Sequence, residues 1–158
     1  MYEESLKTPF VIRYPPTIKP GSHIKRFASN IDWAPTLLDF AGVKIPAEIQ
    51  GKSLLPLFKT PTIKQWRDEL YYHYYEYPDP HRVSPHFGIR TSSYKLIRFY
   101  GAENQWELYD LKRDPNEMQN EYGQTKYKNI IADLKSRLGL LIDEYQDDDA
   151  KKIMMSIK

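Results

Sequence analysis

Residues 106–120, WELYDLKRDPNEMQN, decide the fold of this chain. Their first part is apolar and aromatic, and Leu108 with Tyr109 favours a strand because such side chains pack well on a pleated sheet. Pro115 then fixes its own φ and biases Asp114 away from the helical region, while Asp and Asn side chains bond nearby backbone groups. The stretch therefore predicts a strand that runs into a fixed turn.

Downstream of this turn the hydrophobic period changes to that of a helix. An amphipathic helix of about five to six turns is predicted from a cap at Thr125, and it is suited to covering one face of a sheet. Residues 147–158 are expected to form a flexible tail. The apolar positions of the helix are Ile130, Ile131, Leu134, Leu138, Leu141, Ile142 and Tyr145.

Upstream of the turn, three further segments have strand character. Residues 70–77 are aromatic almost throughout, and residues 86–90 and 94–99 form a predicted hairpin around 91–93. Together with residues 105–111 they predict a small antiparallel sheet of about four strands. The fold class is therefore α+β, with this sheet packed against the long C-terminal helix.

The first 60 residues have a different pattern. Residues 9–14 are expected to form a short strand ended by prolines, and residues 32–42 a helix. Asp32 can cap that helix at its start, and Gly42 can take the left-handed position after its end. Residues 51–58 indicate a loop followed by a short helical turn.

Composition limits the classes of function. The chain has 158 residues, a formal net charge of +2 and dispersed Lys and Arg, so nucleic acid is not an expected partner. It has no apolar run long enough to cross a membrane. The absence of cysteine excludes disulfides and thiolate metal sites. The 13 tyrosines suit a sheet packed on a helix, and a carbohydrate-contacting surface is the open alternative.

No catalytic motif is evident. The four histidines lack HExxH spacing, no metal-binding cluster stands out, and no G-x-S-x-G turn occurs. Asp110, Asp114 and Glu117 could be taken for catalytic carboxylates, but in context we interpret them as holding the turn before the last helix.

The best candidate for a binding site is the segment 79–90. It holds His81, His86 and Arg90 among prolines and next to the tyrosine run. His and Arg are donors suited to a sulfate, phosphate or carboxylate, and prolines reduce the entropy lost on binding. An ordinary polar loop with one histidine bonded to the backbone is the alternative interpretation.

Five segments in the same order resemble sulfatases of the alkaline-phosphatase superfamily. Residues 1–15 resemble the stretch after the active-site lysine, 29–42 the following helix, 50–54 a QGxSL turn, 88–97 the C-terminal hairpin, and 106–120 the signature near the C-terminus. The resemblance, to arylsulfatase-like and N-sulfoglucosamine sulfohydrolase-like enzymes, covers residues 1 to about 145.

This resemblance implies that the N-terminal catalytic part lies outside the chain. Residues 1–60 are then a remnant of the end of the α/β domain, 61–146 the C-terminal subdomain, and 147–158 the tail. Such enzymes hydrolyse sulfate esters or sulfamates with a formylglycine, made from a C/S-x-P-x-R motif, and a calcium ion. The motif is absent here, so no catalytic or metal-binding residue and no cofactor is assigned to this chain. Both cofactors are expected in the full-length parent enzyme.

The sequence thus supports a C-terminal sulfatase portion that contributes substrate-pocket loops and is inactive alone. Its expected partners are a sulfated glycan and the missing N-terminal domain, and the resemblance implies substrate contacts for His81 and His86. Arg90 could equally bridge the subdomain to the missing core. The alternatives are a stand-alone module that binds sulfated or anionic glycans, and a fragment that self-associates through exposed apolar surface. The resemblance implies a periplasmic, secreted or lysosomal parent.

Overall fold

The computed structural model describes residues 2–78 and 82–156, which form two compact units. The first, here called the sheet unit, joins residues 2–8 to residues 69–156. The second, the helical unit, consists of residues 9–68. The chain therefore enters the sheet unit, leaves it for sixty residues, and returns to it.

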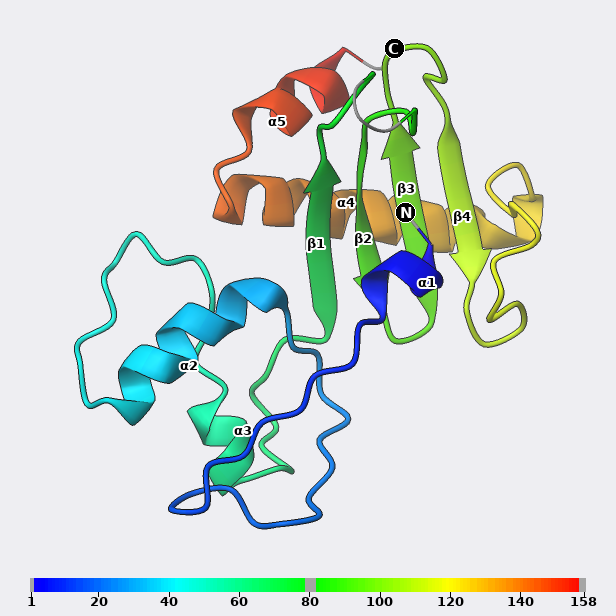
Figure 1. The fold of residues 1–158 in the computed structure, drawn as a ribbon. Helices are drawn as coiled ribbons and strands as arrows, with labels where there is room; N and C mark the ends of the chain where they lie inside the picture. The colour runs from blue at the N-terminus through cyan, green and yellow to red at the C-terminus, as the bar shows by residue number, and fades with distance from the viewer. Residues whose placement is uncertain (1, 79–81, 157–158) are drawn as a thin grey trace. The chain divides into compact units, whose positions relative to one another are not determined.

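The sheet unit contains the predicted four-stranded antiparallel sheet. Its strands are β1 (Glu69–Tyr74), β2 (His86–Thr91), β3 (Tyr94–Phe99) and β4 (Trp106–Asp110). They lie side by side in the order in which they occur in the sequence (Figure 1). The α+β prediction is confirmed.

A long helix covers one face of this sheet, as predicted. The 3-10 turn η2 (Thr125–Tyr127) leads into α4 (Lys128–Glu144), which crosses behind the strands in Figure 1. Apolar residues of the helix and of the sheet form one buried cluster, whose loss of water-exposed surface is the main stabilising contribution. The cluster includes Phe87, Ile89, Leu96, Leu108, Leu134, Leu138, Leu141 and Ile142.

The turn after β4 is fixed by its own polar side chains, as the sequence predicts. The Asp110 carboxylate accepts from the backbone N–H of residue 112 at 3.2 Å, and that of Asp114 accepts from the N–H of residue 119 at 2.8 Å. Asn120 accepts from the N–H of Leu108 at 3.0 Å. These bonds replace regular ladder bonds where the chain leaves the sheet.

Where a flexible tail is expected, the structure has a further helix, α5 (Asp148–Met155). Asp147 caps it, because its Oδ1 accepts from the Ala150 N–H at 2.9 Å. Asp147 Oδ2 also accepts from the Tyr71 hydroxyl of β1 at 2.6 Å, and Ala150 is fully buried. The acidic run therefore begins a helix that packs on the sheet unit.

The helical unit contains η1 (Asn30–Asp32), α2 (Trp33–Phe40) and α3 (Leu55–Lys59). The two helices confirm the predicted helix and the predicted helical turn, and Gly42 has the expected positive φ of 67°. Asp32 is fully buried and accepts from the backbone N–H of Lys52 at 2.8 Å and from Arg67 Nη2 at 2.7 Å. It ties the loops of this unit together.

Residues 9–14 are irregular, so the strand expected there is wrong. A strand needs a neighbour to satisfy its backbone groups, and no strand is present in residues 9–68. Val11 is 92% exposed, and Trp33 and Leu37 of α2 are also exposed. Phe10 stacks on Trp33 with ring centroids 5.5 Å apart. The helical unit thus presents apolar side chains on its surface.

Two glycines test this fold as a matched pair. An added Cβ on Gly88 of β2 would lie 2.4 Å from the Leu96 carbonyl oxygen and 2.9 Å from the Tyr72 hydroxyl. We expect Gly88→Ala to lower the free energy of unfolding by about 1–3 kcal/mol or more. Gly139 of α4 has open space, so Gly139→Ala should raise it by about 0.5–1 kcal/mol. Chemical denaturation measures both, and equal effects would contradict the strand register.

Candidate functional site

Both described site candidates lie on the sheet face that α4 does not cover, here called the outer face. Side chains alternate along a strand, and Phe87 and Ile89 belong to the core under α4. His86 and Arg90 therefore point the other way, opposite Phe99 and Lys95 of β3 in the register. The short helix α1 (Glu3–Leu6) lies in front of this face in Figure 1.

His86 is a buried, neutral histidine at the start of β2. It is 1% exposed, and its Nδ1–H donates to the Ser84 carbonyl oxygen at 2.8 Å. Burial lowers the pKa of His86 to about 4, although the bond to Ser84 opposes that shift. Its Nε2 atom has no partner among the residues described by the structure. At neutral pH this nitrogen can only accept a hydrogen bond.

Aromatic rings surround His86. It stacks on Tyr74 with centroids 5.3 Å apart, lies 4.8 Å from the Phe99 ring, and meets Tyr72 edge-on at 5.8 Å. The aromatic run of β1 thus forms the wall of an apolar site around one imidazole. The bond from His86 to the Ser84 carbonyl is the contact expected if segment 79–90 is an ordinary polar loop with one histidine bonded to the backbone.

Arg90 lies at the other end of β2 and is held by a carboxylate. Its Nη2 donates to Glu3 Oε2 at 2.8 Å and its Nε to Glu3 Oε1 at 3.3 Å. A strand rises about 3.3 Å per residue, which places Arg90 and His86 about 13 Å apart, too far to share one sulfate group. His81 lies outside the described residues. Contact of any of the three with a sugar stays a prediction.

Arg90 belongs to a buried charged cluster that we did not predict. Lys95 of β3 is fully buried between two carboxylates, with its Nζ 3.0 Å from Glu3 Oε1 and 2.5 Å from Glu117 Oε1. Glu117 Oε2 accepts from the Glu3 backbone N–H at 2.5 Å. We call Glu3, Arg90, Lys95 and Glu117 the charged cluster.

The charged cluster lowers the pKa of the Glu3 carboxyl. Burial alone would raise the pKa of Glu3, but hydrogen bonds from Arg90 and Lys95 outweigh it and lower the pKa to about 2. Glu3 therefore remains ionised throughout the physiological range. The sequence holds one signal of the cluster: Lys95 interrupts an apolar strand, at a position that shares its face with Arg90.

A second polar network joins β1 to α5. His73 donates from Nδ1 to Asp147 Oδ2 at 2.6 Å, and its Nε2 lies 2.8 Å from the Tyr100 hydroxyl. Burial and then the hydrogen bond to Asp147 raise the pKa of Tyr71 far above its usual value. The Tyr71 hydroxyl therefore stays protonated and donates to Asp147. Because Asp147 caps α5, we interpret this network as holding α5 against β1.

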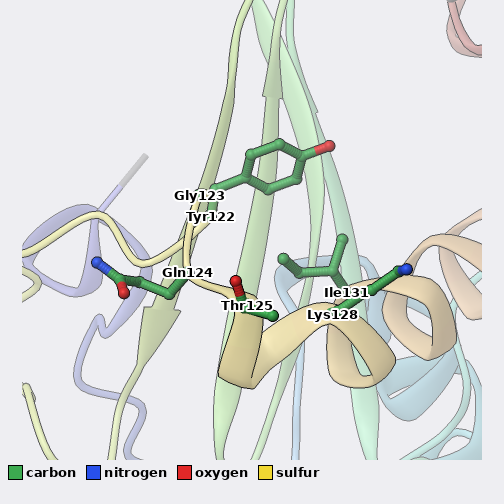
Figure 2. Close-up of a pocket in the computed structure, with 6 residues that line it drawn as sticks. All are labelled: Tyr122, Gly123, Gln124, Thr125, Lys128 and Ile131. Carbon is green, nitrogen blue, oxygen red and sulfur yellow. The ribbon is translucent and has the colours of Figure 1, made fainter.

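One pocket of about 410 Å³ lies where the chain enters α4 (Figure 2). Figure 2 shows the Tyr122 ring on one side and the Ile131 and Lys128 side chains of α4 on the other. The Tyr122 hydroxyl accepts from Lys135 Nζ at 2.7 Å, and its ring stacks on Trp106. The lining residues are Tyr122, Gly123, Gln124, Thr125, Lys128 and Ile131, and none belongs to the segment 79–90.

The described residues form neither a metal-binding cluster nor a membrane-spanning helix. Within residues 2–78 and 82–156, no three His, Asp or Glu side chains are arranged to hold a metal ion. These residues therefore do not fit a calcium site. No helix in the described part of the chain combines the length and the apolar character needed to cross a membrane.

Comparisons with known proteins match nearly the whole chain to sulfatases. A family model described as N-sulphoglucosamine sulphohydrolase, C-terminal, matches residues 1–144. The chain is 48% identical over 153 residues to an N-acetylglucosamine-6-O-sulfatase of Bacteroides thetaiotaomicron, covering 94% of this chain and 27% of that protein. It is 30% identical over 158 residues to a Delta 4,5-hexuronate-2-O-sulfatase of the same organism, covering 93% of this chain and 31% of that protein.

The fold also matches solved structures. A protein solved in complex with its substrate D-glucosamine-2-N,6-O-disulfate superposes with a TM-score of 0.84 at 47% identity, covering 88% of this chain and 28% of that one. The chain thus spans between 27% and 31% of the length of these relatives.

The neutral state of His86 gives a pH test. An unfolded histidine binds a proton near pH 6.5, whereas folded His86 does so near pH 4. Its contribution to stability is therefore complete above pH 6.5 and declines as the pH falls toward 4. His86→Asn keeps a donor for Ser84 but cannot titrate. We expect the variant to lose less unfolding free energy than the wild type between pH 7 and 4, measured by urea denaturation. An equal loss in both proteins would contradict a neutral His86.

Proposed function

Since this chain belongs to the family of N-sulphoglucosamine sulphohydrolase C-terminal regions, we propose that it forms the C-terminal portion of a sulfatase. That enzyme would hydrolyse sulfate esters or sulfamates of a sulfated glycan. The supporting observation is that sulfatases match the chain almost from end to end while extending well beyond it. The N-acetylglucosamine-6-O-sulfatase among them makes a sulfated glucosamine the first substrate to try.

In this proposal the chemistry belongs to the rest of the enzyme. The sequence offers no C/S-x-P-x-R motif, and its described residues have no cluster that fits calcium. The formylglycine and the calcium ion would therefore be supplied by residues outside this chain. The formylglycine would supply the nucleophile, and the calcium ion would supply positive charge that stabilises the sulfate group under attack, with the sugar oxygen or nitrogen as the leaving group. No step of the reaction is assigned to a residue of this chain.

The proposed contribution of this chain is a substrate-facing loop beside the aromatic wall. Residues 75–85 connect β1 to β2, and the end of this connection at β2 is fixed by the His86–Ser84 bond and by the rings around His86. A neutral Nε2 accepts, so its partner would be a hydroxyl or amide donor rather than a sulfate oxygen. His81 would be the sugar-contacting histidine of the loop, and Arg90 would serve the charged cluster.

The proposal predicts where activity resides. The pure 158-residue chain should not turn over an aryl sulfate or glucosamine 6-sulfate, whereas a longer sulfatase that contains it should. His81→Ala in that longer enzyme should raise KM about tenfold with a smaller effect on kcat, because a sugar contact is lost. Steady-state kinetics measures both. Turnover by the isolated chain would refute the division of labour, and an unchanged KM would remove His81 from the site.

A second candidate function, a glycan-binding module, is favoured by the pocket in Figure 2. It combines the Tyr122 ring with Gln124, Thr125 and Lys128, which are groups that can stack on a sugar and bond to its hydroxyls or sulfates. This candidate does not require the rest of an enzyme.

Titration separates this candidate from the first. If the chain is a binding module, D-glucosamine-2-N,6-O-disulfate should shift the amide resonances of residues 122–131 saturably at millimolar concentration. Lys128→Ala should weaken that binding, and Lys152→Ala, an exposed lysine of α5, should not. An absence of saturable shifts would reject the module and leave the sulfatase portion as the function.

A further inference from the structure

Glu117 stands out in the turn after β4 because its backbone conformation does not suit its side chain. Its φ is 54°, in the left-handed region where glycine and asparagine are preferred. The turn does not need its carboxylate, since Asp110 and Asp114 already accept from backbone N–H groups of the turn, those of residues 112 and 119. A glutamate at this position therefore indicates a requirement from outside the turn.

That requirement is the charged cluster. The Glu117 carboxylate leaves its own turn to accept from the Glu3 N–H and to pair with Lys95, both at 2.5 Å. The cluster holds two carboxylates and two cations, so its formal charge is zero. Lys95 is fully buried, and removal of one partner would leave a buried charge without compensation. The four residues therefore depend on one another.

What the cluster holds is α1. This helix has four residues and no side-chain cap, and a helix of that length is not stable by itself. Residues 9–68 separate it in the sequence from the rest of the sheet unit, so contacts with the sheet and the turn help to place it on the outer face. The charged cluster supplies contacts to Glu3 from β2, β3 and the turn. Tyr2 adds an edge-on contact with Tyr109 at 5.9 Å.

We propose that Glu117 and Lys95 are positioning residues that fix α1 on the outer face of the sheet. In the proposed sulfatase, α1 is where the preceding part of the enzyme would join this region. The cluster would then align that part with the substrate-facing loop. This second statement rests on the proposed function, whereas the first concerns the isolated chain alone.

Amide hydrogen exchange in the 158-residue chain tests the first statement. Glu117→Gly removes the carboxylate but suits the positive φ, so it separates the cluster from the turn. We expect the Glu3 and Lys7 amides to exchange at least about tenfold faster, while the amides of α4 stay protected. Glu4→Gln, an exposed glutamate of the same helix, is the matched control and should change nothing. The proposal would be overturned if the Glu3 amide were equally protected from exchange in Glu117→Gly and in the wild type. It would also be overturned if that amide were unprotected in the wild type.

A double variant tests whether the charges act together. Lys95→Met leaves two carboxylates facing Arg90, whereas Lys95→Met with Glu117→Gln leaves only the balanced Glu3–Arg90 pair. We expect the double variant to recover part of the Glu3 protection that Lys95→Met loses. If the two residues act independently, the fold-increase in Glu3 exchange in the double variant equals the product of the fold-increases in the two single variants. That result would contradict the mutual dependence of the charges.

Kinetics of the longer enzyme tests the second statement. If the cluster aligns the preceding part of the enzyme, Glu117→Gly should lower kcat about tenfold or more and leave KM within about twofold. Glu4→Gln should keep both constants. Faster exchange with an unchanged kcat would restrict the cluster to folding and overturn its role in alignment. A longer protein without sulfatase activity would instead refute the proposed function and leave the exchange result standing.

Discussion

The burial of the Lys95 ammonium group is the constraint on which the outer face of the sheet depends. A charge inside a protein is tolerated only when carboxylates neutralise it at short range. Here the two carboxylates come from distant places, Glu3 near the start of the chain and Glu117 in the turn after β4. Satisfying one lysine therefore brings α1, the central hairpin and the turn into one arrangement.

This constraint gives the stretch from Trp106 to Asn120 a specific physical meaning. Its aspartates and its asparagine hold the turn, and its glutamate works outside the turn on α1. The carboxylates that suggest catalysis in isolation thus each have a structural hydrogen-bond partner. This is consistent with a chain that belongs to the C-terminal region of a sulfatase family, whose proposed chemistry would reside in residues outside it.

The parts of the fold that the sequence predicts are those with a local period. The strands, the hairpin and α4 follow from alternation and from helical spacing, because burial against one neighbour is enough to select them. Residues 9–14 have the same strand character but no strand partner among residues 9–68, so local preference fails there. The helix α5 was missed because its acidic start was interpreted as part of a flexible tail, although Asp favours the N-cap and the first turn of a helix.

The candidate site was less predictable, for a physical reason. The pairing of Arg90 with Glu3 joins residues 87 positions apart, and no local pattern encodes that contact. His86 carries the residue type of an anion-binding site, but burial makes it neutral and leaves it an acceptor. The role of a charged side chain is thus set by its partners and its solvent exposure, which only the folded chain reveals.

The central claim is that Lys95 and Glu117 are energetically coupled in holding the outer face together. A double-mutant cycle of Lys95→Met and Glu117→Gln on the free energy of unfolding measures that coupling directly. We predict a coupling free energy of about 2 kcal/mol. The double variant should therefore lose less unfolding free energy than the sum of the losses in the two single variants. A coupling near zero would contradict the claim, because the two charges would then contribute to stability independently.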